Sequence, residues 1–252
     1  MTNKDSIRKQ FGENAESYAI SKVHSQGGSL ERLVQLVQPD AAWRVLDVAT
    51  GAGHTAFAFA PYVAEVRATD ITFEMRRQAQ ELARTRELHN IVVEEADAEK
   101  LPYGDQSFDL VTCRIAPHHF SDIAAFVKES ARVLRAHGIL AIVDNVVPDA
   151  GPGDYINAFE KLRDPSHNRC LSVDEWIALL VDHGFDIQVY ETMNKEMDFE
   201  FWAKRHDENM QRYLRAMLTG SAAAAADFLK PSVTESGISF QLTEGIFIAE
   251  KI

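Results

Sequence analysis

Short apolar runs alternate with longer amphipathic segments through the middle of the chain. The runs are rich in β-branched residues and predict five strands, at residues 43–48, 63–69, 91–94, 108–114 and 139–146. Apolar residues that recur at spacings of three and four predict the intervening helices, at residues 55–62, 73–88 and 121–134. Because predicted strands and helices alternate, the pattern is typical of βαβ units around a parallel sheet.

The segments on either side of this region also carry periodic patterns. Two amphipathic helices are expected ahead of it, at residues 7–18 and 29–37. After it, prolines and glycines at residues 148–153 interrupt the pattern, and a short helix at 155–162 leads to the polar stretch 163–169. The remaining predicted elements are a helix that begins at Ser172 with a capping-box Glu175, a strand at 185–190, helical residues 200–218 and a final strand at 238–249.

These elements predict one α/β domain over residues 1–252. We expect it to have four parts. They are an N-terminal helical cap at residues 1–40, a βαβ core at 41–147, a lid-like insertion at 148–170, and a C-terminal part of the sheet with a helical insertion at 171–252.

Composition narrows the class of protein further. The formal net charge of −12 would repel a polyphosphate, so nucleic acid is a disfavoured partner. Cys113 and Cys170 support neither a disulfide framework nor a thiolate metal site, and we expect a cytoplasmic location. No run of about 18 apolar residues and no secretion signal is present, which predicts that the chain does not insert into a membrane. Whether it forms a homodimer stays open.

The strongest local signal is the segment VLDVATGAGHTAFAFA, in which a buried strand runs into Gly51 and Gly53 and then into a helix. Such a turn brings a ligand close to backbone N–H groups at a helix N-terminus. The spacing to Ala56 also matches the dinucleotide fingerprint G-x-G-x-x-G/A. The glycines alone therefore leave NAD and S-adenosylmethionine both open.

Acidic residues lie at the ends of three successive predicted strands. Asp47 lies just before the glycine turn, where a carboxylate would repel a pyrophosphate and attract an ammonium or sulfonium group. Asp70 follows the second strand and can accept both hydroxyls of a ribose. Asp97 can accept from an adenine amine while the N–H of Ala98 meets a ring nitrogen. Each acid alone could be a turn former or a helix cap, but the set favours an adenosyl cofactor with an amino-acid end.

The segments VLDVATGAGHTA and DAEKLPYGDQSFDLVTCR, together with Asp70, resemble the cofactor motifs of class I S-adenosyl-L-methionine-dependent methyltransferases. The type 11 group is the most similar, and it is related to the ubiquinone/menaquinone C-methyltransferases. RIAPHHFSD and LRDPSHNR also resemble segments of bacterial relatives. The resemblance implies a Rossmann-like fold, with helices on both faces of a mostly parallel seven-stranded sheet whose last strand is antiparallel. Residues 41–147 would then be the cofactor-binding core.

The same resemblance implies where the cofactor and its product S-adenosyl-L-homocysteine would bind. The methionine end would lie at Asp47 to Gly53, the ribose at Asp70, and the backbone near Arg114 close to the sulfonium. The adenine would lie beside Ile71, Met75, Asp97 and Ala98. Tyr18 is a further predicted cofactor-binding residue. One departure is Ala49, where the family usually has glycine; because alanine disfavours positive φ, we expect ordinary backbone there.

Histidines are the candidates for catalysis, because an imidazole titrates near neutral pH. His118 and His119 follow the fourth predicted strand, whose end should face the ligand crevice, and either could be a base or a structural cap. His167, with Arg163 and Asp164, lies in the predicted insertion and could orient a polar substrate or form a surface ion pair. We expect no metal, since neighbouring side chains such as those of the histidine pair usually diverge.

The methyl acceptor is predicted only as a chemical class. The segment RIAPHHF lacks the Asn/Asp-Pro-Pro-aromatic pattern of amino-group methyltransferases. Aromatic residues could line an apolar pocket or simply pack in the core, at Tyr18, Phe120, Tyr155, Phe159, Phe199, Phe201 and Trp202. We expect a small, partly apolar phenol, quinone-like ring or carboxylic acid. The alternatives are an NAD-dependent oxidoreductase and a non-catalytic S-adenosylmethionine-binding protein.

Overall fold

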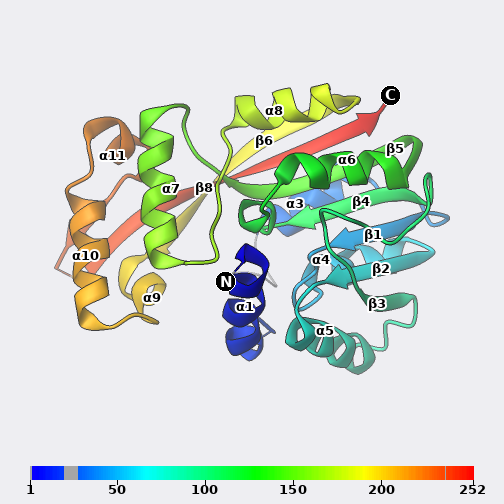
Figure 1. Cartoon of the computed structure of the whole chain (residues 1–252), viewed down its shortest axis with the longest axis horizontal. Coiled ribbons are helices and arrows are strands. Elements are labelled where there is room, and N and C mark those ends of the chain that lie inside the picture. Colours follow the sequence, from blue (N-terminus) through cyan, green and yellow to red (C-terminus); the bar gives the residue numbers. More distant parts are fainter. Residues whose placement is uncertain (1, 20–27, 236) are drawn as a thin grey trace.

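A mixed β-sheet runs through the centre of the molecule (Figure 1). The computed structural model describes residues 2–19, 28–235 and 237–252, without the side chains of residues 14 and 16–19. Within these residues the sheet has eight strands, in the order β3-β2-β1-β4-β5-β8-β6, and β7 pairs with β8 beside this path. The strands are β1 (Arg44–Val48), β2 (Glu65–Asp70), β3 (Ile91–Glu95), β4 (Phe108–Arg114), β5 (Leu134–Val146), β6 (Phe185–Asp198), β7 (Ser232–Thr234) and β8 (Gly237–Lys251).

Strand direction follows the prediction. The pairs β1–β2, β1–β4, β2–β3 and β4–β5 are parallel, whereas β8 is antiparallel to both β5 and β6. The predicted seven-stranded, mostly parallel sheet with an antiparallel last strand is therefore confirmed along its main path. The three-residue β7 was not predicted, because an exposed run of three residues is too short to establish a period.

Helices cover both faces of the sheet (Figure 1). Alternate strand residues enter different cores: Leu46 of β1 packs in one apolar cluster and Val45 in the other. The helices are α1 (Asn3–Ala19), α3 (Gly28–Val37), α4 (His54–Phe59), α5 (Phe73–Thr85), α6 (Ile123–Val133), α7 (Gly151–Arg163), α8 (Val173–Asp182), α9 (Phe199–Ala203), α10 (Glu208–Thr219) and α11 (Ala223–Leu229), with short 3₁₀ helices η1 (Ala60–Tyr62) and η2 (Pro117–His119). None of the helices in the described residues is long and apolar enough to cross a membrane.

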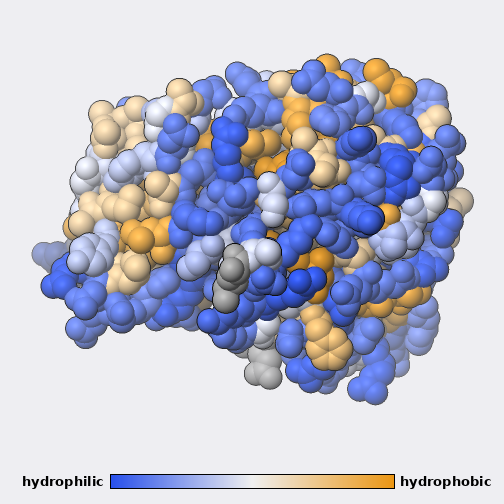
Figure 2. Space-filling view, in the orientation of Figure 1, coloured by the Kyte–Doolittle hydropathy of each residue, from blue (hydrophilic) through white to orange (hydrophobic). Residues whose placement is uncertain are grey.

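A helical lobe, formed by α7, α9, α10 and α11, extends the molecule beyond the parallel strands (Figure 1). It packs on β8 and the end of β6, around an apolar cluster that contains Phe159, Phe199 and Trp202. These aromatic residues are therefore core residues of the lobe and not pocket residues. Figure 2 shows the paler, more apolar surface of this lobe beside the largely hydrophilic face around α1.

Two predicted elements of the C-terminal half need correction. The strand predicted at residues 185–190 continues to Asp198, because polar residues of β6 remain paired with β8. The helix predicted over residues 200–218 is interrupted, and Asp207 begins α10 by accepting a hydrogen bond from the Met210 N–H. The capping box of α8 is confirmed, since Ser172 and Glu175 bond reciprocally.

Candidate active site

A cavity of about 960 Å³, which includes its open mouth, lies at the carboxyl ends of β1, β2 and β4. In open parallel sheets this edge is the usual place for a ligand. Nine of the predicted site residues line the cavity, namely Ala49, Gly51, Asp70, Ile71, Met75, Asp97, Ala98, Arg114 and His119. Four others do not line it: Asp47, Gly53, His118 and His167. The side chain of Tyr18 lies outside the described residues.

Asp47 lies beneath the glycine turn and holds it. Its carboxylate accepts hydrogen bonds from the Thr50 hydroxyl (2.5 Å), the Thr112 hydroxyl (2.6 Å) and the Ala56 N–H (3.2 Å). The side chain is buried, and this burial raises the pKa of Asp47 to about 6 in spite of the three donors. One carboxylate oxygen accepts from Thr50 and Ala56 and the other from Thr112 of β4, and Asp47 does not line the cavity, so its direct attraction of a charged ligand stays a prediction.

The backbone of the turn departs from the prediction at Ala49. Its φ of 52° is positive, as are those of Gly51 (55°) and Gly53 (92°). The expectation of ordinary backbone at Ala49 was therefore wrong. The residue is held in the left-handed region because Thr50 must donate its N–H to the Thr69 carbonyl (2.8 Å) while Asp47 binds the turn from below.

The two glycines serve different purposes. A methyl group added at Gly51 would meet no atom within 4 Å, so the backbone is open on its cavity side. A methyl group added at Gly53 would lie 2.4 Å from the Phe57 ring. Gly53 thus permits close packing of the turn on α4, and Gly51 permits close approach of a ligand.

Asp70 joins the glycine turn to the end of β2. Its carboxylate accepts from the Gly51 N–H (3.0 Å) and from the Thr72 N–H (2.8 Å). Burial raises its pKa, and these bonds counter the effect. The carboxylate lies at the wall of the cavity, where its remaining acceptor capacity could take hydroxyl donors.

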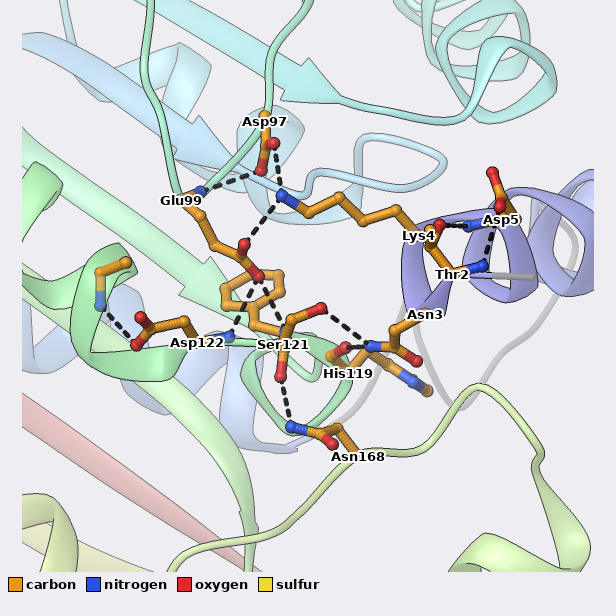
Figure 3. A network of polar contacts seen from close by, with 12 residues as sticks. Thr2, Asn3, Lys4, Asp5, Asp97, Glu99, His119, Ser121, Asp122 and Asn168 are labelled. Carbon is orange, nitrogen blue, oxygen red and sulfur yellow. Dashed lines mark hydrogen bonds and ion pairs between the residues drawn. The ribbon is translucent and has the colours of Figure 1, made fainter.

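Asp97 lies at the end of the cavity covered by α1. Figure 3 shows the Lys4 ammonium between Asp97 and Glu99, at 2.5 and 2.7 Å from their oxygens. The amide of Asn3 donates to the His119 carbonyl (2.6 Å) in the same view. The ion pairs of Lys4 and the hydrogen bond of Asn3 therefore hold α1 over the cavity.

The three predicted histidines lie together in η2 and the 163–170 segment. The ring centroids of His118 and His119 are only 4.1 Å apart, and His167 lies 5.4 Å from His118. The expected divergence of the neighbouring pair was wrong, because the 3₁₀ turn brings the two rings to one side. No group of three potential metal ligands converges in the described part of the chain.

His118 and His167 have structural partners. His118 Nδ1 lies 2.5 Å from Asp144, which also accepts from the His118 N–H (2.8 Å). Burial lowers the pKa of His118, but the charge and hydrogen bond of Asp144 outweigh this and raise it. His167 Nε2 contacts the Asn157 side chain at 2.9 Å, and burial lowers its pKa to about 3.

His119 is the histidine that borders the cavity. Its ring meets Phe11 of α1 edge-on, with centroids 5.0 Å apart, and its Nδ1 lies 3.2 Å from the Ser166 hydroxyl. Burial lowers its pKa well below the ordinary value, and the positive charge of His118 adds to this effect. The imidazole is therefore neutral at physiological pH, as a base requires.

Several residues of the site were not predicted. Lys4, Ile7 and Phe11 line the cavity from α1, and their spacing of three and four along an amphipathic helix was the available signal. Asp144 and Ser166 lacked any such signal, since their roles depend on contacts between segments 26 and 47 residues apart in sequence.

The strand order and the turn at the ligand edge define a class I methyltransferase fold. Comparison with known proteins agrees. The model of the family described as "Methyltransferase domain" matches residues 46–142. The uncharacterized methyltransferase YcgJ of Bacillus subtilis (strain 168) is 40% identical over 196 residues, which is 77% of this chain and 78% of that protein. The chain belongs to this family of S-adenosylmethionine-dependent methyltransferases.

Solved structures and a further relative support the assignment. The crystal structure of YcgJ superposes with a TM-score of 0.84 at 34% identity, covering 88% of this chain and 97% of that one. A putative methyltransferase from Bacillus halodurans C-125 gives 0.85 at 33% identity, covering 89% and 99%. The ubiquinone/menaquinone biosynthesis C-methyltransferase UbiE of Zymomonas mobilis is 34% identical over 119 residues, which is 45% of this chain and 49% of that protein.

Proposed function

We propose that the chain transfers a methyl group from S-adenosylmethionine to a small, partly apolar acceptor that loses a proton. The observation that carries the proposal is that the predicted cofactor-binding groups and the candidate base line the same cavity. The open backbone at Gly51, the carboxylates of Asp70 and Asp97, and the ring of His119 all border it.

The donor and acceptor groups fit the cofactor residue by residue. Asp70 suits the ribose hydroxyls, and the open side of Gly51 suits the methionine end. Adenine suits the space beside Ile71 and the buried Met75, where Asp97 could accept from its amine. Lys4 now bonds to Asp97, so adenine binding would share or displace that ion pair.

When bound, S-adenosylmethionine supplies an electrophilic methyl carbon on a positively charged sulfur. The chain's own contribution is to align the acceptor and exclude water. His119 would accept the proton that the acceptor loses, and the lone pair of its ring nitrogen would form the new N–H bond. His118 and His167 would support the ring and take no proton from the acceptor, since neither residue lines the cavity.

An apolar wall surrounds His119 and suggests the acceptor class. Phe11, Ile115, Ala116 and Phe120 border this end of the cavity. A flat ring that carries a hydroxyl or carboxyl group could pack there with its acidic proton near His119. The similarity to a quinone methyltransferase supports the same class of acceptor.

Binding calorimetry with S-adenosylmethionine, S-adenosylhomocysteine and NAD tests the cofactor. We expect the wild type to bind both adenosyl ligands, and Asp70→Asn to weaken both by about 10- to 100-fold, the cost of a lost charge-assisted hydrogen bond. Asp109→Asn is the matched control, because Asp109 is also a buried strand carboxylate bonded to a backbone N–H, that of Arg44, but lies outside the cavity lining.

Two other outcomes would redirect the proposal. Binding of NAD alone would indicate an oxidoreductase. If the adenosyl ligands bind but a panel of phenols, quinols and carboxylic acids gives no labelled product, a non-catalytic binding protein becomes the better interpretation.

A further inference from the structure

Three side chains joined by hydrogen bonds, those of His119, Ser166 and Asp164, connect the cavity wall to the helical lobe. His119 Nδ1 lies 3.2 Å from Ser166 Oγ, and Ser166 Oγ lies 2.6 Å from an oxygen of Asp164. All three residues are buried. The second oxygen of Asp164 forms an ion pair with Arg205, which follows α9, at 3.2 Å. The carboxylate is therefore fixed on both sides.

The number of hydrogens that these three side chains carry decides which of them donates each hydrogen bond. A serine hydroxyl has one hydrogen, and the carboxylate of Asp164 can only accept. Burial raises the pKa of Asp164, but a positive charge on His119, the hydrogen bonds from Ser166 and the charge of Arg205 outweigh it and lower this pKa. The ion pair with Arg205 and the two bonds from Ser166 do not depend on the charge of His119, and they require the ionised carboxylate. Ser166 must then donate to Asp164 and accept from His119. The hydrogen of the neutral imidazole consequently lies on Nδ1.

The other ring nitrogen of His119 is left available. Nε2 has no hydrogen-bond partner among the residues that the structure describes, and the ring borders the cavity whereas Ser166 does not. The neighbouring rings of His118 and His167 bond to Asp144 and Asn157, and among the described residues neither ring forms a hydrogen bond with the Ser166 hydroxyl.

We propose that Ser166 and Asp164 are positioning residues that hold His119 with its proton on Nδ1 and its lone pair on Nε2. The inference rests on the proposed function, in which His119 accepts a proton from the methyl acceptor. When Nε2 gains that proton, the imidazolium donates from Nδ1 to Ser166, whose hydroxyl still donates to Asp164. The negative charge of Asp164 thus stabilises the product of the proton transfer without itself moving a proton.

Nitrogen NMR of the histidine-labelled protein tests the tautomer directly. Loss of one ring spin system in His119→Gln assigns the signals of His119. We expect the wild type to show a protonated Nδ1 and an unprotonated Nε2. In Ser166→Ala the preference should fall, with a measurable fraction of the form that is protonated at Nε2, whereas Ser166→Thr should restore it. Ser130→Ala is the matched control, because Ser130 is equally buried and its hydroxyl donates to the Phe126 carbonyl of its own helix.

Kinetics separate this inference from the proposed function. Once an acceptor is known, Ser166→Ala should lower kcat by about 10-fold or more while the Kd for S-adenosylmethionine stays within twofold. A wild-type His119 protonated at Nε2, or a tautomer that Ser166→Ala leaves unchanged, would overturn the inference whatever the activity. The predicted tautomer together with full activity in His119→Gln would instead remove His119 as the base and leave the positioning contact intact.

Discussion

Four residues with positive φ lie where the chain leaves the ends of the central strands β1 and β4. Ala49, Gly51 and Gly53 follow β1, and Ile115 follows β4 on the neighbouring side of the cavity. A left-handed conformation costs an L-residue about 1–2 kcal/mol, so such positions persist only where surrounding bonds determine them. At Ala49 and Gly51 those bonds come from Asp47, Thr69 and Asp70.

Gly51 offers a test of whether the turn admits a ligand. Gly184 has the same two properties, a positive φ (81° against 55°) and no atom within 4 Å of an added methyl group, but it follows α8 away from the cavity. Gly51→Ala and Gly184→Ala should each lower the free energy of unfolding by about 1 kcal/mol. Only Gly51→Ala should weaken S-adenosylmethionine binding, by about 10-fold or more, in calorimetry. Equal affinity of the two variants would mean that the ligand does not approach Gly51.

At the scale of elements, periodicity predicted most of the core correctly. The strand over residues 108–114 and the N-terminal helices were found because their apolar residues repeat at the required spacing. The end of β6 was missed because its polar residues are held by pairing with β8, which no local pattern reports. The site shows the same division: Asp70 and Asp97 follow strands and were recognisable, whereas Ser166 reaches His119 only through the folded chain.

The helix α1 covers the cavity, and its Phe11 ring packs edge-on against the His119 ring. Phe11→Ala should widen the acceptor end and remove apolar contact worth about 1.5–3 kcal/mol in burial. We expect KM for the acceptor, or Kd for an unreactive analogue, to rise by about 10-fold or more. Lys9→Ala is the matched control, since Lys9 is an exposed residue of the same helix outside the cavity lining. A similar effect of both variants would assign the change to loss of α1 itself.

Charged side chains connect the helical lobe to the part of the molecule that holds the cavity. Asp144 holds η2 to β5, and Arg205 ties Asp164 to the segment after α9. The Arg205 side chain also donates to the carbonyl of Arg163 at the end of α7 (2.8 Å), so the lobe positions the segment that carries Ser166 and His167. The helical lobe is therefore joined to the cavity by polar contacts as well as by the sheet strands that run through both parts.

Buried titratable groups give the stability of the whole molecule two opposed dependences on pH. Burial lowers the pKa of His167 from 6.5 to about 3, so between these pH values the unfolded chain binds a proton at this residue that the folded chain does not. The free energy of unfolding therefore decreases as the pH falls from about 6.5 toward 3. Asp47 acts in the opposite direction. Its pKa is raised from 3.8 to about 6, so the folded chain binds the extra proton and stability is lost as the pH rises through this window.

Asp47→Asn isolates the second effect, because the amide does not titrate. At about 1.4 kcal/mol for each pH unit, the free energy of unfolding of the wild type should fall relative to that of Asp47→Asn by about 2.4 kcal/mol between pH 4 and pH 7. Urea unfolding at several pH values measures this difference, in which the contributions of His167 and the other groups cancel. A constant difference would show that folding leaves the pKa of Asp47 at its ordinary value. The three donors from Thr50, Thr112 and Ala56 would then fully offset its burial, and the turn would rest on a buried, ionised carboxylate at pH 7.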